Sequence, residues 1–506
     1  MDKTLEILPQ NKVKQLYPYQ TLAIQQIMEG ITQQEVKKNI IFQLPTGGGK
    51  TVIFSEITKR FVLETGKKVL ILTHRIELLK QTYGVLEEVG IASKIIVSDV
   101  DKIDDHESFS CYLAMVETLN NRLQEYENYL PDIDLVIVDE AHYNSFRKIF
   151  QYFKGAVILG FTATPLSSNI NLPLKENYQR LIVGDSIPEL IKNQYLSEAT
   201  TFTFDVNLES LKIGIDGDFT VSSLERLYSE YDMQDKLIKA YEEWSLGSKT
   251  LIFNSSIASS KVVEQLFIKS GYEIKHLDST YGKEERRETL EWFKNKPDAI
   301  LTSVGILTTG FDEPTVETII LNRATRSLTL YHQMCGRGSR ILPTKKTFKI
   351  IDLGNNAKRL GLWQDFVDWK EVFLNPNKFL ESLAVWEEKI NSGLIYNLPE
   401  YVKRNFPKTA SFGFDMEETY YNMLKKARKT VEAVDLSIED HYQRIIDNTD
   451  DLFEALDLLN LLQDEIQFRL RVYTNCMAKS TRSYFLYLLD NYNDRIKNRL
   501  RKELYK

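Results

Sequence analysis

Two short stretches of the sequence combine residue types that could bind and hydrolyse a nucleotide. The first is QLPTGGGKT, which supplies Thr46, Gly47, Gly48, Gly49, Lys50 and Thr51. The general phosphate-loop pattern has a further glycine at the position of Leu44, so this entrance is a variant. Glycines let backbone N–H groups close around phosphate oxygens, a lysine reaches the outer phosphates, and a threonine hydroxyl binds Mg²⁺.

The second stretch is DLVIVDEAHYN, an apolar run that ends in two carboxylates. A buried strand has no packing reason to end in Asp139 and Glu140. The carboxyl ends of strands in α/β sheets are where ligands bind. Asp139 is suited to hold Mg²⁺ together with Thr51, and Glu140 to orient and deprotonate the attacking water. With Lys50 ahead of it, this pair predicts an ATPase that uses ATP and Mg²⁺.

Both stretches need strands and helices that bring them to one edge of a sheet. Apolar runs alternate with helical patterns, first in NIIFQL, KVLILT, DLVIVDE and AVILGFT, and then in KTLIFN, AILTSV, VETIILN and FKIIDL. Continuous runs of this length indicate strands buried in parallel sheets. We predict two α/β domains, residues 1–195 and 228–358, joined by a linker or small insertion over 196–227.

The remaining residues, 359–506, lose the strand pattern. Apolar residues recur there at helical spacing, as in Leu452, Leu456, Leu459, Leu462, Ile466 and Leu470. This pattern predicts a mainly helical C-terminal domain. Its basic end, NDRIKNRLRKELYK, suits either phosphate contact or a solvated face. The domain is also a candidate dock for a protein partner, and nothing in the pattern requires more than a monomer.

Bulk properties set outer limits on the function. A chain of 506 residues exceeds what one core can hold, and its net charge of −7 does not by itself indicate a nucleic-acid partner. Cys111, Cys335 and Cys476 lie far apart without metal-ligand spacing, which favours a reducing compartment over disulfides or zinc. The sequence lacks a signal-peptide pattern and a membrane-length apolar run. We therefore expect a cytoplasmic protein with no membrane partner.

In their order along the chain, these motifs resemble those of superfamily 2 helicases of the DEAD/DEAH group, over residues 12–355. QLPTGGGKT is similar to the family's A-x-T-G-x-G-K-T, residues 139–142 read DEAH, and FTATP resembles its third motif. The resemblance implies two tandem RecA-like domains, with Thr162 and Thr164 coupling hydrolysis to strand movement. LYPYQ resembles the entry motif, which implies that Gln20 hydrogen-bonds adenine. Tyr17 departs from the family, which often has Arg at this position, and its aromatic ring could stack on the base instead.

Further motifs resemble the family's nucleic-acid contacts. LTHRIELLKQT and AMVETLNNR imply backbone contacts by Arg75 and Thr118. The fourth and fifth motifs, TLIFNSSIASS and SVGILTTGFDEP, add Asn254, Ser255 and Thr308 to the nucleic-acid set, and Gly310 and Asp312 to the nucleotide set. Such backbone contacts position a strand without reading its sequence.

YHQMCGRGSR resembles the sixth motif, Q-x-x-G-R-x-x-R, through Gln333, Arg337 and Arg340. A planar guanidinium from a facing domain can stabilise the charge that spreads over the γ-phosphoryl oxygens. The resemblance therefore implies that Arg340 is an arginine finger, that Arg337 senses phosphate, and that Gln333 belongs to the catalytic set.

RATRSLTLYHQMCGRGSR, followed by IIDLGNNAKRLGLWQDFVDW, resembles the RadD-like and phage DNA helicases, near the UvsW, XPB and type III restriction groups. This implies a phage or bacterial enzyme that moves along, unwinds or remodels DNA, at forks or branched junctions, beside the nucleoid or in an infected host. DNA is favoured over RNA. Three alternatives stay open: a translocase without strand separation, an RNA helicase, and a nucleic-acid-binding scaffold switched by ATP.

Overall fold

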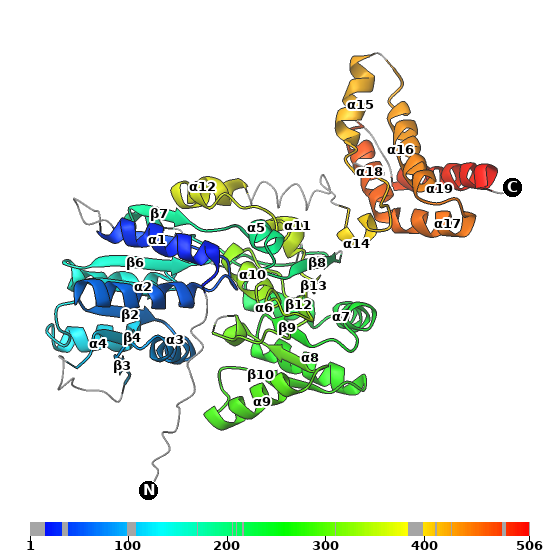
Figure 1. The fold of residues 1–506 in the computed structure, drawn as a ribbon. Helices are drawn as coiled ribbons and strands as arrows, with labels where there is room; N and C mark the ends of the chain where they lie inside the picture. The colour runs from blue at the N-terminus through cyan, green and yellow to red at the C-terminus, as the bar shows by residue number, and fades with distance from the viewer. Residues whose placement is uncertain are drawn as a thin grey trace, which may run out of the picture. The chain divides into compact units, whose positions relative to one another are not determined.

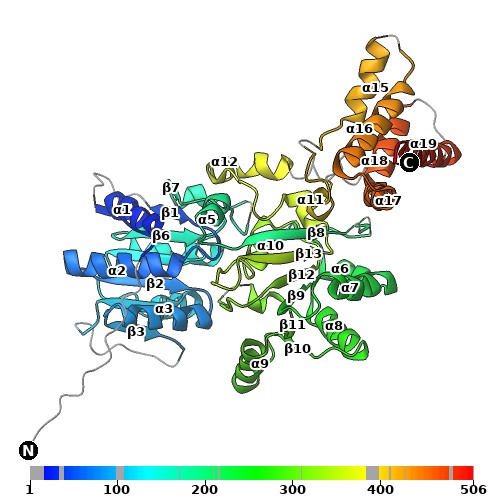
Figure 2. The same ribbon diagram turned by 45° about the vertical axis from the view of Figure 1, so that its right-hand side comes forward.

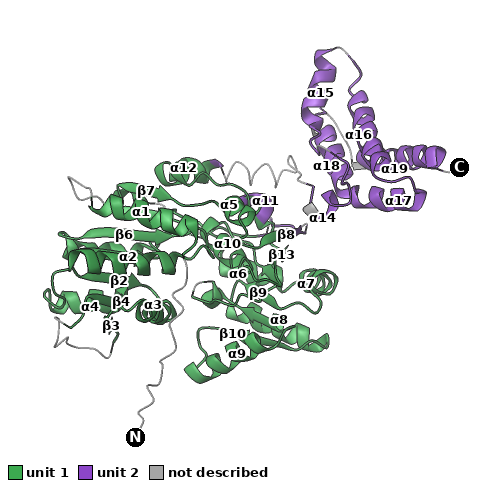
Figure 3. Ribbon diagram, in the orientation of Figure 1, with its two compact units in different colours: residues 1–199, 211–356, 361–381 green, residues 200–210, 357–360, 382–506 purple. Residues whose placement is uncertain are grey.

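The computed structural model describes residues 16–32, 39–98, 108–169, 171–204, 206–208, 210–214, 217–308, 310–382, 398–409, 412–426, 428–477 and 482–504. The chain divides into two compact units (Figure 3). Residues 1–199, 211–356 and 361–381 form the first, and residues 200–210, 357–360 and 382–506 the second. Across these described ranges, every helix is too short or too polar to cross a membrane.

The first unit contains a seven-stranded parallel sheet, blue to teal in Figure 1. Its strands are β1 (Ile40–Gln43), β2 (Val69–Thr73), β3 (Ser93–Ile96), β4 (Cys111–Met115), β5 (Leu135–Asp139), β6 (Val157–Thr162) and β7 (Arg180–Val183), in the order β3-β4-β2-β5-β6-β1-β7. Both β1 and β5 pair with β6, on opposite sides of it. The loops that follow β1 and β5 therefore meet at the carboxyl edge of the sheet, on either side of Thr162.

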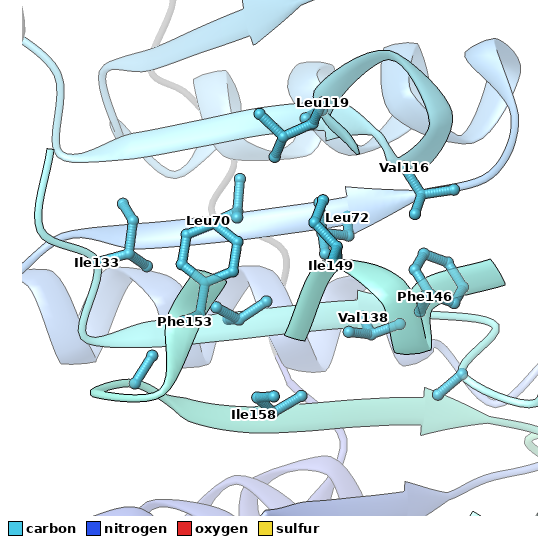
Figure 4. Packing of buried hydrophobic residues seen from close by; sticks show 14 of the residues in the cluster. Leu70, Leu72, Val116, Leu119, Ile133, Val138, Phe146, Ile149, Phe153 and Ile158 are labelled. Atoms are coloured by element: carbon cyan, nitrogen blue, oxygen red, sulfur yellow. The ribbon is translucent and has the colours of Figure 1, made fainter. Parts of the chain in front are cut away.

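Helices cover both faces of this sheet. They are α1 (Pro18–Thr32), α2 (Lys50–Thr65), α3 (Ile76–Glu88), α4 (Val116–Glu125), η1 (Asn144–Phe153), η2 (Leu174–Glu176) and α5 (Ile187–Lys192). Helix α2 contacts α1 and α3. Over the other face, Leu119 of α4 and Phe146, Ile149 and Phe153 of η1 pack on the strands (Figure 4). This apolar core fixes the strands from which the site loops start.

A second parallel sheet, of six strands, lies in the middle of the chain (Figures 1 and 2). It runs β10 (Ile274–Leu277), β11 (Ile300–Ser303), β9 (Thr250–Asn254), β12 (Thr318–Asn322), β13 (Thr347–Asp352) and β8 (Glu198–Thr203). Its helices are α6 (Val221–Tyr228), α7 (Tyr231–Trp244), α8 (Ile257–Lys269), α9 (Lys283–Asn295), η3 (Gly305–Leu307) and α10 (Leu328–Cys335). Residues 357–360 of helix α11 (Asn356–Leu360) belong to the second unit. All eight apolar runs quoted from the sequence are strands of the two sheets.

Two segments do not follow the predicted domain divisions. Residues 196–227, predicted as a linker or insertion, contain strand β8 of the second sheet and helix α6. Helix α12 (Trp369–Leu374) lies beyond residue 358, yet Phe373 belongs to the core beneath η1. Its apolar residues Trp369, Val372 and Phe373 are buried, which accounts for the return of the chain to the first unit. The division of the chain into domains stays a prediction.

The second unit is mainly helical, as predicted for the fold class. It contains α14 (Glu400–Lys403), α15 (Met416–Lys425), α16 (Glu432–Asn448), α17 (Leu452–Leu461), α18 (Gln463–Asn475) and α19 (Arg482–Leu504). The apolar series that begins at Leu452 is shared between α17 and α18, with Leu462 at their junction. In the basic end, Arg495 and Arg499 pair with Asp435 and Glu439 of α16, at 2.7 and 2.6 Å. Part of this charge is thus used within the helical bundle.

Candidate active site

The phosphate loop lies between β1 and α2, and glycine is required at two of its positions. Gly47 and Gly49 have φ angles of 94° and 83°, in the left-handed region that side chains disfavour. Helix α2 begins at Lys50, whose Nζ donates to the Leu44 carbonyl at 3.3 Å. Leu44 is fully buried, and a Cβ on Gly48 would lie 2.7 Å from its Cγ. The leucine at the variant entrance therefore packs beneath the loop.

The two carboxylates stand at the end of β5, both buried. Glu140 has a φ of 52°, which is strained for a residue with a side chain. Its N–H donates to Asp139 Oδ1 at 3.0 Å, while its Oε2 has no hydrogen-bond partner among the described residues. His142 Nδ1 lies 3.4 Å from this Oε2. Strain and a buried oxygen without a hydrogen bond at one residue are typical of a site that a ligand completes.

Burial and charge shape the ionisation of this cluster. Burial raises the pKa of Asp139 to about 7, with a further rise from Glu140 and an opposing effect of Lys50. Burial also opposes ionisation of Glu140, but Lys50 and His142 bring its pKa below the usual value. Burial lowers the pKa of Lys50, against the pull of both carboxylates. The cluster thus keeps Glu140 ionised, as a general base requires.

Three tyrosines and a glutamine surround the start of the loop. The ring of Tyr195 lies 4.6 Å from that of Tyr17 and 4.9 Å from that of Tyr19, between centroids. The Tyr19 hydroxyl donates to the Gly48 carbonyl at 2.8 Å. Gln20 Nε2 would be only 2.5 Å from a Cβ at Gly49. The predicted base-contacting residues Tyr17 and Gln20 are therefore together at the loop, with two tyrosines that the sequence patterns did not single out.

The predicted coupling residues form a hydrogen-bonded path across the sheet edge. His142 Nδ1 lies 2.9 Å from Thr162 Oγ1, which donates to the Thr164 carbonyl at 3.0 Å. The Thr164 hydroxyl then donates to Thr329 Oγ1, on α10, at 2.9 Å. This path connects the DEAH segment with the helix that precedes the two arginines.

Arg337 and Arg340 approach the loop from the second sheet. A Cβ at Gly47 would lie 3.1 Å from Arg340 Nη1, and one at Gly336 would lie 2.7 Å from Thr46 Cβ. Arg340 Nε donates to Asp312 at 2.7 Å. Burial lowers the pKa of Arg337 to about 10, with a further fall from Arg340.

Backbone contacts hold both arginines. Arg337 Nε and Nη2 donate to the Thr308 carbonyl at 3.1 and 2.7 Å. The Ser197 hydroxyl donates to the Arg340 carbonyl at 2.9 Å. The predicted nucleotide residue Gly310 lies instead against α3, where a Cβ would be 3.4 Å from Glu77.

The predicted nucleic-acid residues fall into two groups. Arg75 and Thr118 are partly exposed, and Arg75 donates to the carbonyls of Ile306 and Gly305 at 3.1 and 3.4 Å. Asn254, Ser255 and Thr308 are buried instead. The Asn254 amide donates to Thr302 at 2.8 Å and its carbonyl oxygen accepts from Asn322. Asn254 is therefore used between strands, because it stands at the end of a central strand, and the structure does not present it to a nucleic acid.

Three adjacent rings beside Glu140, those of His74, Tyr143 and His142, were not predicted from the sequence. The Tyr143 ring lies 4.2 Å from the His74 ring and 4.3 Å from the His142 ring. Both His74 nitrogens, and Nε2 of the predicted catalytic residue Gln333, are buried with no hydrogen-bond partner in the described part of the chain. Burial lowers the pKa of His74 to about 4, partly offset by Glu140. In the sequence, only the position of His74 directly before the predicted nucleic-acid residue Arg75 indicated that it could belong to the site.

Family comparisons agree with this arrangement. Residues 13–167 match the family described as "Type III restriction enzyme, res subunit". Residues 232–342 match the "Helicase conserved C-terminal domain". The two matched ranges contain the phosphate loop, the DEAH segment and both arginines.

Individual proteins show the same likeness. The IRC3 protein of Saccharomyces cerevisiae, named as an ATP-dependent helicase, is 33% identical over 410 residues, which is 75% of this chain but 58% of IRC3. A fragment assigned as an HsdR subunit of a type I restriction enzyme from Vibrio vulnificus YJ016 has a TM-score of 0.53 and 22% identity, over 69% of this chain and 67% of that one. The type ISP restriction-modification enzyme LlaBIII, bound to DNA, has a TM-score of 0.52 and 15% identity, over 96% of this chain and 41% of that one.

Proposed function

We propose, from the premise that this chain belongs to the superfamily 2 helicases, that it is a DNA-stimulated ATPase that moves along DNA and unwinds or remodels it. The observation that carries the proposal is the meeting of the phosphate loop with an arginine of the second sheet. Arg340 Nη1 stands 3.1 Å from the position of a Cβ at Gly47. An ATP molecule held by the loop would therefore face groups from both sheets.

The residues of the loop edge fit a bound nucleotide. Thr46 Oγ1 and Glu140 Oε2 are buried without a hydrogen-bond partner in the described ranges, so a ligand would satisfy them. The backbone of Gly47 and Gly49 provides the cradle, and Lys50 begins the helix whose N-terminus favours an anion. The tyrosines around Gln20 offer flat rings to a base.

Mg²⁺, when bound, would neutralise charge on the outer phosphates. Thr51 and Asp139 are the residues that would hold it. Glu140 would accept a proton from the attacking water through its carboxylate. Arg340 would leave Asp312 to stabilise the charge that develops on the γ-phosphoryl oxygens, since the ion pair is partly exposed and therefore weak.

DNA as the nucleic acid is supported by the restriction-type relatives, one of which was solved bound to DNA. Arg75 is the best placed of the predicted contacts, because its fork already donates to main-chain oxygens at the second sheet. A phosphate could replace those oxygens, and the release of counterions would then make binding fall steeply with salt. Cycles of closure and opening of the two sheets around ATP would move the strand.

The test is ATP hydrolysis by the full chain with no nucleic acid, single-stranded DNA, duplex DNA, forked DNA or RNA, together with strand displacement on the fork. We expect stimulation by DNA. Lys50→Ala and Arg340→Ala should each lower the rate by roughly 10³-fold. The exposed Asp235→Ala, on α7, is the control and should leave the rate unchanged.

Other outcomes would identify the alternatives. Stimulation by RNA alone would reassign the substrate, and hydrolysis without displacement would indicate a translocase. ATP binding without hydrolysis would indicate an ATP-switched scaffold. A wild-type rate for Arg340→Ala would remove the arginine finger.

A further inference from the structure

Between β8 and α6, residues 212–214 and residues 217–220 are hydrogen-bonded to each other as the two sides of a turn. Ile213 and Phe219 make an antiparallel bridge. Gly214 N donates to the Asp218 carbonyl at 2.7 Å, and Thr220 N donates to the Lys212 carbonyl at the same distance. Phe219 is 8% exposed. The turn is thus fixed at both ends and anchored by one buried ring.

Asp218, near the tip of this turn, uses both carboxylate oxygens on the turn between β12 and α10. Its Oδ2 accepts from the Thr325 hydroxyl at 2.5 Å, and its Oδ1 accepts from Arg326 N at 2.7 Å. Oδ1 also accepts from Phe219 N at 2.8 Å. Arg323 Nη2 lies 3.9 Å from Oδ2. Hydrogen bonds to an ionised acceptor are about twice as strong as neutral ones, so this contact holds the turn firmly.

The turn that Asp218 holds sets the start of α10. Thr325 Oγ1 accepts from Ser327 N at 3.1 Å, and Ser327 Oγ caps the helix by accepting from Leu330 N at 3.2 Å. On the opposite side, Asn356 Oδ1 accepts from Thr325 N at 2.8 Å. The hydroxyl of Thr325 therefore connects the Asp218 carboxylate directly to the helix cap.

Helix α10 has only eight residues. It carries Thr329, which bonds Thr164 of the first sheet, and it ends one residue before Gly336, which contacts Thr46. A shift in the position of the first turn of so short a helix also moves its last turn, because few turns lie between them. The position of its start thus determines how far Arg337 and Arg340 reach toward the phosphate loop.

We propose that Asp218 is a positioning residue for ATP hydrolysis. Its carboxylate fixes the start of α10 and thereby aligns Arg337 and Arg340. This inference rests on the proposed function, since it needs Arg340 to act on the nucleotide. It gives residues 211–220, which read as a linker in the sequence, a defined task in the reaction.

The experiment measures steady-state ATP hydrolysis by the full chain with saturating DNA. Asp218→Ala should lower kcat about 10-fold or more, with KM for ATP changed by less than about 2-fold, because alignment acts in the transition state. Asp218→Asn should recover part of kcat, since its amide oxygen still accepts from Arg326 N. Asp235→Ala, which removes an exposed Asp–Lys pair on α7, is the matched control and should retain the wild-type kcat.

A role in folding alone would give a different pattern. If Asp218 acts through Arg340, adding Asp218→Ala to Arg340→Ala should cost less than about 2-fold more, whereas independent effects would multiply. Full multiplication, or a wild-type kcat in a folded Asp218→Ala chain, overturns the proposal. If Arg340→Ala itself retains the wild-type rate, the arginine-finger assignment fails first and this inference fails with it.

A second pair of variants serves if Asp218→Ala does not fold. Thr325→Val removes the hydroxyl that donates a hydrogen bond to Asp218, and Thr325→Ser keeps this hydroxyl. We expect Thr325→Val to lower kcat and Thr325→Ser to retain most of it. Equal kcat values for the two variants contradict the proposal.

Discussion

At the carboxyl edge of the second sheet, buried polar side chains form one continuous hydrogen-bonded chain. It runs through Asn322, Asn254, Thr302, Ser260, His276 and Asp278, with each step between 2.8 and 2.9 Å. At the same edge of the first sheet, Thr46, His74 and Glu140 keep buried atoms that find no hydrogen-bond partner among the described residues. The two sheets share an architecture, but these two groups of buried polar side chains differ in whether the protein satisfies them.

This difference indicates that the polar chain of the second sheet is structural, whereas the polar groups of the first sheet form a ligand site. A buried polar atom without a partner is costly, so most are paired within the protein. In the second sheet the chain from Asn322 to Asp278 follows that rule and gains rigidity, while Arg323 Nε, directly after β12, is an exception at the same edge. The first sheet leaves atoms unpaired beside a strained Glu140 and the phosphate loop, where a ligand would complete them. Substitutions at the first edge should therefore affect activity more than stability, and those at the second edge should do the reverse.

The largest expected effect is that of Glu140→Gln. We expect ATP hydrolysis to fall by about 10³-fold, because an amide cannot accept the proton of the attacking water. The free energy of unfolding should change by about 1 kcal/mol at most, since Glu140 Oε2 makes no hydrogen bond within the described chain and its contact with His142 Nδ1 is long, at 3.4 Å. Steady-state hydrolysis and urea unfolding measure the two quantities. A large loss of stability would contradict the comparison.

Asn254→Leu tests the opposite edge. It leaves the Asn322 amide without its acceptor and removes one of the two hydrogen bonds of Thr302, which keeps its bond to Ser260. At about 2 kcal/mol for the unpaired group and about 1 kcal/mol for the lost bond, we expect a loss of about 3 kcal/mol in the free energy of unfolding. Hydrolysis by the folded chain at low temperature should remain near wild type. Ser255→Ala, at the neighbouring position, is the control with a small expected effect. An unchanged urea midpoint for Asn254→Leu would refute the assignment of Asn254 to the scaffold.

The unpaired His74 predicts a dependence of stability on pH. Its pKa is about 4 in the folded chain, below the ordinary value of 6.5, mainly because it is buried. The unfolded chain therefore takes up this proton first as the pH falls, and stability is lost between pH 6.5 and 4. The loss is at most about 3.4 kcal/mol, from about 2.5 pKa units at 1.36 kcal/mol each. His74→Phe keeps a ring against Tyr143 and should reduce this loss, as urea unfolding at pH 7 and pH 5 would measure. An equal loss in both proteins would rule out His74 as its source.

The smallest expected effect concerns the tyrosines. Tyr195→Leu should raise KM for ATP about three- to tenfold and leave kcat unchanged, because a ring contact with a base contributes about 0.5–1.5 kcal/mol. Tyr195→Phe keeps the ring and should retain the wild-type KM. If both variants bind ATP as the wild type does, the base does not lie against Tyr195.

The sequence was most informative where local chemistry and position coincide. Glycine at 47 and 49, a lysine at a helix start and carboxylates at a strand end identified the loop edge in advance. Strands with long apolar runs were also predictable. The four-residue strands β3, β7 and β10 were not, because all three lie at the edge of a sheet and include polar or half-buried positions.

Other features depend on tertiary contacts that no local pattern encodes. Asn254 has a polar side chain of the kind that contacts nucleic acid at a surface, but it is buried at the end of the central strand β9. Asp218 lies in a stretch rich in Asp, Gly and Ser, which is typical of a linker. Its carboxylate nevertheless accepts hydrogen bonds from Thr325 and Arg326, more than a hundred positions later in the chain. Tyr195 reaches Tyr17 only because α5 returns the chain to the start of the loop. Such pairings follow from the order of strands in the sheets and not from spacing along the chain.

The contact between Thr46 and Gly336 has a consequence for how this sequence can change. A methyl group added at position 336 would overlap the Thr46 side chain, so the volume available at either position depends on the other. The side chains tolerated at the two positions are therefore linked, although Thr46 lies in the loop after β1 and Gly336 follows α10. A smaller residue at position 46 would remove only part of the overlap, because the same methyl group would lie 2.9 Å from the His332 carbonyl oxygen. Libraries that randomise both positions together should therefore still recover glycine at 336, while the residue at 46 varies.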